Sequence, residues 1–159
     1  MSMENYLKIL EDSLIKKSRV LDKISAYNEE QAKIFSEGKA DLDKFDEYID
    51  KKDQLIEELS KLDEGFDILY ANVAKQLNQE REKYAVQIRS LQALVREVTD
   101  KSVSIQAQEA RNKTLIEKYF AKQRESVKNN RVSSKAAYDY YKSMSAIGNM
   151  SSQFLDRKN

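Results

Sequence analysis

One seam of residues, spaced alternately three and four apart, runs from Leu42 to Lys122 without a change of phase. This spacing is that of an α-helical coiled coil and differs from the alternation of a β-strand. A helix with such a seam must pack against a partner, so the seam predicts an all-α protein. Its members are Leu42, Phe45, Ile49, Lys52, Ile56, Leu59, Asp63, Phe66, Tyr70, Val73, Leu77, Glu80, Tyr84, Gln87, Leu91, Leu94, Val98, Lys101, Ile105, Gln108, Asn112, Leu115 and Tyr119.

The composition agrees with long helices and excludes several kinds of site. Pro is absent, and charged residues make up 35% of the 159 residues. Without His or Cys the chain lacks the commonest general base, the thiolate nucleophile and the usual zinc ligands. The three glycines stand alone at positions 38, 65 and 148, so no phosphate-binding loop is present. We therefore expect no enzyme, no cofactor and no metal site.

Two further observations concern location and charge. No run of eighteen apolar residues occurs, and the amphipathic start Met1 to Leu10 resembles neither a signal peptide nor a membrane span. We expect a cytoplasmic protein without membrane insertion. Residues 29–67 hold fourteen acidic and six basic residues, whereas residues 111–135 hold eight basic and two acidic ones. Because the net charge is only +1, nucleic-acid binding is not expected.

A first helix is predicted from Ser2 or Met3 to near Gly38, with Asp41 as the N-cap of the next helix. The link Ser36 to Ala40 then gives an antiparallel helical hairpin. The first helix carries its own seam, and polar residues on the two seams (Lys17, Asn28, Gln31 and Lys52) are expected to fix the register. The seam of the first helix is Leu7, Leu10, Leu14, Lys17, Leu21, Ile24, Asn28, Gln31 and Phe35.

The first helix is too short to cover the whole second seam, which leaves two arrangements. In one, the chain breaks at Asp63-Glu64-Gly65 and a third helix returns to form a three-helix bundle. In the other, the second helix continues through Gly65, a defect of about 1 kcal/mol, and its distal half pairs with a second copy of the chain. The constant phase across Gly65 favours the second arrangement.

The end of the chain differs from the rest. The seam stops near Asn129, so we expect a helical domain over residues 1–128 and a flexible tail over 129–159. Within the tail, Tyr138, Tyr141 and Met144 fall on one side of a short amphipathic helix that ends at Gly148. Tyr and Met side chains make adaptable contacts, which is typical of partner-binding segments.

Three stretches carry a resemblance to a known family. They are Leu55 to Leu59 before Asp63-Glu64-Gly65-Phe66, the segment Glu109 to Ile116, and the tail that ends in Phe154-Leu155-Asp156-Arg157-Lys158. Together they resemble flagellar type III export chaperones of the FlgN type. The resemblance covers most of the chain.

The resemblance implies a chaperone that binds the C-terminal amphipathic helix of hook–filament junction proteins and delivers them to the export gate component of the type III apparatus. It implies client contacts late in the long helix and in the tail. The alternative is a constitutive coiled-coil scaffold or tether, a homodimer without a client. The matching positions for client binding are Asn112, Leu115, Ile116, Tyr119, Phe120, Tyr138, Tyr141 and Met144.

Overall fold

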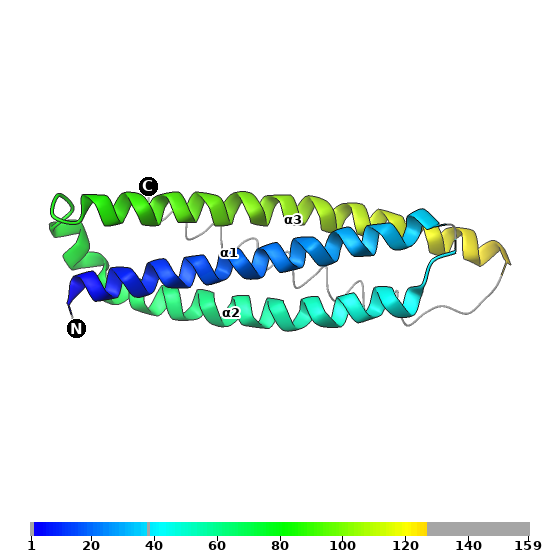
Figure 1. Ribbon diagram of the computed structural model, residues 1–159, viewed down its shortest axis with the longest axis horizontal. Helices are drawn as coiled ribbons and strands as arrows, with labels where there is room; N and C mark the ends of the chain where they lie inside the picture. The colour runs from blue at the N-terminus through cyan, green and yellow to red at the C-terminus, as the bar shows by residue number, and fades with distance from the viewer. Residues whose placement is uncertain (1, 38, 127–159) are drawn as a thin grey trace.

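The computed structural model describes residues 2–37 and 39–126, and these residues form an elongated bundle of helices (Figure 1). Helix α1 spans Met3–Ile34 and continues into a short 3-10 helix, η1, over Phe35–Glu37. Helix α2 spans Leu42–Gln79, and helix α3 spans Ala85–Ser126. The predicted all-α class is confirmed. The short C-terminal helix predicted within 129–159 lies outside the described residues.

The N-cap predicted at Asp41 is present, and Ser2 caps the start of α1. The side chain of Ser2 accepts a hydrogen bond from the backbone N–H of Asn5 at 3.3 Å, and that of Asp41 accepts from Lys44 at 3.1 Å. Each cap satisfies one of the amides that a helix start leaves without an intrahelical acceptor. The hairpin of α1 and α2 therefore begins and turns where the sequence predicts.

Helix α1 is the central element of the bundle. It packs against α2 on one side and against α3 on the other, whereas no Cα of α2 comes within 8 Å of a Cα of α3 (Figure 1). Its predicted seam is buried except at Phe35, which is half-buried. One helix thus supplies the core for two partners, which explains why α1 buries polar as well as apolar seam residues.

The structure corrects the prediction for the second seam. Helix α2 does continue through Gly65, but it ends at Gln79, and a turn over residues 80–84 leads into α3. Helix α3 then runs back along α1, so the chain forms the three-helix bundle of the less favoured arrangement, with its break after Gln79 and not at Asp63-Glu64-Gly65. The distal half of the seam packs on α1 of the same chain. The first four residues of the turn, Glu80-Arg81-Glu82-Lys83, are charged, and its last residue, Tyr84, is buried in the core.

The register of α3 also differs from the prediction. Every second member of the predicted seam, from Tyr84 to Asn112, is buried as expected, but the row between them is displaced by one residue: it begins at Ile88, whereas Gln87 is half-buried. The members of the shifted seam share burial and the same three-and-four spacing. They are Tyr84, Ile88, Leu91, Val95, Val98, Ser102, Ile105, Glu109, Asn112 and Ile116.

Gly65 lies in the middle of α2 and is exposed, and a Cβ built on it meets no atom within 4 Å. Replacing Gly65 by Ala is expected to raise the free energy of unfolding by about 0.5–1 kcal/mol, because Ala loses less backbone entropy in a helix. Urea unfolding measures this change. The matched control is Ala71→Gly at another exposed position of α2, which should lower stability by a similar amount. A destabilised Gly65→Ala variant would show that α2 is not continuous there.

Candidate functional site

A charged group lies at the centre of the bundle, where all three helices meet. The Nζ atom of Lys52 on α2 lies 2.7 Å from Asn28 Oδ1 and 3.1 Å from Glu109 Oε1, and it also donates to Gln31 Oε1. The side chain of Lys52 is fully buried and that of Glu109 is 5% exposed. We call Asn28, Gln31, Lys52, Glu109 and Asn112 the polar node. It joins α1, α2 and α3 through one ammonium group.

Burial lowers the pKa of Lys52 to about 8, although the carboxylate of Glu109 opposes this shift. Desolvation disfavours the charged form of any buried amine, and a nearby carboxylate favours it. Here the loss of water outweighs the attraction. The ion pair is therefore a costly feature of the core, which the surrounding amides offset by accepting hydrogen bonds from Lys52.

The rest of the polar node connects the ion pair to the backbone. Asn112 Nδ2 donates to the Asn28 carbonyl at 3.1 Å, and Gln31 Nε2 donates to the Phe45 carbonyl at 3.2 Å. The first bond joins α3 to α1 and the second joins α1 to α2. Each forms in only one alignment of its two helices, since a shift by one residue would leave buried polar groups without hydrogen bonds. The node thus fixes the register of the bundle, as predicted for Asn28, Gln31 and Lys52. Sequence reasoning missed Glu109, which lies one position off the predicted seam.

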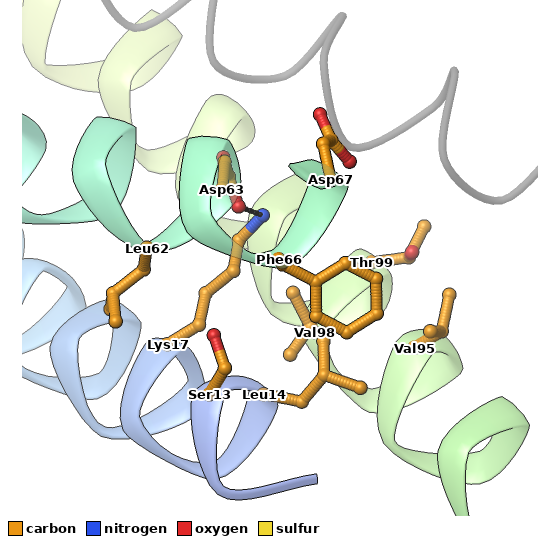
Figure 2. Close-up of a pocket in the computed structure, with 10 residues that line it drawn as sticks. All are labelled: Ser13, Leu14, Lys17, Leu62, Asp63, Phe66, Asp67, Val95, Val98 and Thr99. Atoms are coloured by element: carbon orange, nitrogen blue, oxygen red, sulfur yellow. Dashed lines mark hydrogen bonds and ion pairs between the residues drawn. The ribbon is translucent and has the colours of Figure 1, made fainter. Parts of the chain in front are cut away.

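A second buried ion pair lies toward the other end of the bundle. Lys17 Nζ on α1 and Asp63 Oδ1 on α2 are 2.7 Å apart, with side chains 7% and 12% exposed. They line a small pocket between the three helices, with Leu14, Phe66 and Val95 as neighbours (Figure 2). Burial raises the pKa of Asp63 above its usual range, and Lys17 opposes the shift. This pair also fixes the register of α1 against α2, as predicted for Lys17.

Aromatic side chains gather at the end of the bundle where α1 joins α2 and where α3 ends. The rings of Phe35 and Phe45 have centroids 5.5 Å apart, and Tyr119 lies 5.9 Å from Phe35. Phe120 in turn lies 6.0 Å from Tyr119. We call Phe35, Phe45, Tyr119 and Phe120 the aromatic cluster. Phe45 is fully buried, whereas the other three rings are half-buried.

The structure divides the predicted client-binding residues of α3 into two groups. Asn112 is fully buried in the polar node, and Ile116 is 2% exposed within the core. Leu115, Tyr119 and Phe120 are half-buried at the end of α3 beside the link. Only the second group offers surface to a partner. The other predicted positions, Tyr138, Tyr141 and Met144, lie outside the described residues.

Two other kinds of site are absent from the described part of the chain. Over residues 2–37 and 39–126, no three acidic, His or Cys side chains are grouped so that they could hold a metal ion. None of the described helices combines the length and hydropathy needed to cross a bilayer.

Comparison of the chain with protein-family models, with curated proteins and with solved structures gave no match.

Proposed function

We propose that this protein is a cytoplasmic export chaperone of the FlgN type. It binds the C-terminal amphipathic helix of a hook–filament junction protein, keeps that protein unassembled and delivers it to the type III export apparatus. The proposal comes from the sequence resemblance. The observation that best supports it is the half-buried apolar surface at the end of α3, formed by Leu115, Tyr119 and Phe120.

This surface has the chemistry that an amphipathic helix requires. Leu115 and Tyr119 are four residues apart and so lie on one side of α3. Lys118, Lys122 and Arg124 on the same turns are exposed and basic. A client helix with an apolar stripe and acidic flanks would bury the stripe against the aromatic side chains and place its carboxylates near these bases.

The position of the surface also fits the proposal. It lies in the last turns of α3, which ends at Ser126, so the rest of the chain begins close to it. Tyr138, Tyr141 and Met144 follow Phe120 by 18 to 24 residues in the sequence, so they can reach a client bound there. Asn112 and Ile116 are occupied inside the bundle, and we assign them to the support of α3 and not to direct contact.

A paired substitution tests the surface. Tyr119→Ala with Phe120→Ala is expected to weaken binding of a peptide from the C-terminal helix of the junction protein by about tenfold or more, since aromatic anchors carry much of the energy of such interfaces. Fluorescence anisotropy of the labelled peptide measures the affinity.

The matched control is Val103→Ala, which removes an apolar side chain that is 59% exposed on α3 away from this end. It should leave the affinity unchanged. Because Tyr119 also packs on Phe35, circular dichroism must show that the double variant remains helical. A folded double variant with unchanged affinity would place the client elsewhere.

A further inference from the structure

One row of buried residues continues at intervals of seven from the end of α2, across the turn over residues 80–84, and along α3. Its members are Leu77, Tyr84, Leu91, Val98, Ile105 and Asn112, and each is at most 6% exposed. An interval of seven keeps side chains on one face only where the chain is helical throughout. Two helices joined by a turn do not need it, because each can set its phase independently. The row therefore indicates that residues 77–91 also suit a single unbroken helix.

The turn itself contains no residue of a type that commonly ends a helix. The C-cap of α2 is Glu80. The three residues that follow, Arg81, Glu82 and Lys83, are good helix formers and differ from the Gly or Asn found at many helix ends. The backbone N–H of Tyr84 already donates to the Glu80 carbonyl at 3.3 Å, as it would in an α-helix.

The same turn leaves helical hydrogen bonds unformed. Among the described residues, no carbonyl accepts from the backbone N–H groups of Arg81, Glu82 and Lys83. In a continuous helix each of these groups would donate to the carbonyl four residues earlier. Straightening the turn therefore adds backbone hydrogen bonds and removes none of the helical ones.

Helix α3 is held by contacts that an identical helix from a second copy could make. It packs along α1, whereas the described residues of α2 and α3 have no Cα pair within 8 Å. Gln108 Nε2 of α3 donates to Ser25 Oγ of α1 at 2.9 Å, and Glu109 reaches Lys52 of α2 with its side chain. Each contact joins α3 to the hairpin of α1 and α2. Exchange of α3 between two chains would preserve all of them.

The geometry at the turn leaves room for such an exchange. The start of α1 lies at the same end of the bundle as the turn (Figure 1). Extending the register of the Lys17–Asp63 ion pair to this end places Met3 level with Leu77 of α2, and α3 begins at Ala85 beside the same end. On one continuous helix Leu77 and Ala85 are eight residues, about 12 Å, apart. The α1 helices of two copies can therefore lie end to end along it.

We propose that the turn over residues 80–84 is a hinge through which two copies of this chain exchange α3. In the resulting dimer, α2 and α3 form one helix from Leu42 to Ser126, and α3 packs on α1 of the other copy. Glu109 of each copy then completes the polar node around Lys52 of the other. Because the single chain and the dimer share these contacts, the chain concentration during folding decides between them. No client takes part, so the inference is independent of the proposed function.

Chains with single cysteines test the exchange, since the protein has no cysteine of its own. Ser25→Cys and Gln108→Cys chains are unfolded together in urea and refolded at about 1 mM, and a short bismaleimide is then added. The two positions are in contact between α1 and α3, so the reagent joins two chains only if α3 of one packs on α1 of the other. We expect a covalent dimer in denaturing electrophoresis, and about tenfold less of it after refolding at about 1 μM.

Each cysteine variant refolded alone gives the background of the reagent. A refolded mixture that is wholly monomeric in light scattering would overturn the proposal. So would a dimer whose chains are not joined above that background, because its copies would associate through another surface.

Glycines in the turn test its role as the hinge. Arg81→Gly with Glu82→Gly should lower the dimer fraction by about tenfold or more, because glycine disfavours the continuous helix and is tolerated in the turn of the single chain. The matched control, Ala71→Gly with Asn72→Gly, changes exposed positions of α2 that are helical in both forms and should leave the fraction unchanged. Equal dimer fractions in the two double variants would show that the turn is not the hinge.

Discussion

Replacing Lys52 by Met is expected to lower the free energy of unfolding by about 3–5 kcal/mol. The substitution keeps the length of the side chain but leaves the Glu109 carboxylate in the core without the ammonium group 3.1 Å away. Removing one partner of a buried ion pair is costly because the remaining charge has lost both water and its counterion. Urea unfolding measures the loss. Lys61→Met, at an exposed position of α2, is the control and should change stability by less than about 0.5 kcal/mol.

The double variant Lys52→Met with Glu109→Leu separates the charge from the packing. Both charges are then absent, so we expect stability within about 1 kcal/mol of the original chain or above it. A double variant as unstable as Lys52→Met alone would show that the hydrogen bonds of Asn28 and Gln31 to Lys52, and not the unbalanced charge, dominate this site.

The pH dependence of the same pair gives a second readout. The pKa of Lys52 in the fold is about 8, against 10.5 in the unfolded chain. Between pH 8 and 10.5, Lys52 is mostly deprotonated in the folded state but still protonated in the unfolded chain. The free energy of unfolding therefore rises with pH across this window, and the gain is lost as the pH falls through 8. The gain is about 3 kcal/mol relative to the double variant Lys52→Met with Glu109→Leu, in which neither group of the pair titrates. An equal pH dependence in the original chain and in this double variant would contradict the lowered pKa of Lys52.

Ending the chain after Asn130 is expected to abolish capture of the client helix while α1, α2 and α3 remain helical. The deletion removes Tyr138, Tyr141 and Met144 but leaves the aromatic cluster. Loss of several apolar anchors should weaken affinity by about 100-fold. Peptide anisotropy measures binding, and circular dichroism measures helicity. The full-length control Tyr138→Ser, Tyr141→Ser, Met144→Ser should behave in the same way. Unchanged affinity in both chains would remove the tail from the client site.

Much of the hairpin could be predicted because its signals are local. The seam from Leu7 to Gln31, the cap at Asp41 and the link after Ile34 each follow from spacing or from residue type. The function of polar seam residues such as Asn28 was also predictable, since an amide in a narrow seam can be satisfied only in one register.

The position of the second turn could not be predicted in the same way. Gly65 was the visible candidate, yet a helical Gly costs only about 1 kcal/mol, which the packing of Phe66 and Leu59 on α1 can offset. The real turn contains no Gly, Pro or Asn. Its sequence, Glu80 to Lys83, would suit an exposed helix equally well, and only the return of α3 onto α1 shows that the helix ends there.

Glu109 was missed by the sequence analysis because the second buried row of α3 lies one residue beyond the predicted one. Leu94 and Val95 are both apolar, so the sequence allowed either register. The predicted register placed Gln108 on the seam, whereas Glu109 is the residue that meets Lys52. A buried Lys on the α2 seam is itself a signal that some carboxylate must lie nearby. Of the predicted client residues, the same local reasoning could not tell buried Ile116 from half-buried Leu115.

The most direct test of the proposed function is calorimetric titration of the full chain with the C-terminal helix peptide of the junction protein encoded in the same genome. We predict saturable binding at one peptide per chain, with a gain of helicity in the circular dichroism of the mixture and a negative heat-capacity change from apolar burial. Absence of binding at about 100 μM peptide, together with a dimer that persists on dilution in light scattering, would contradict the chaperone proposal and favour the scaffold.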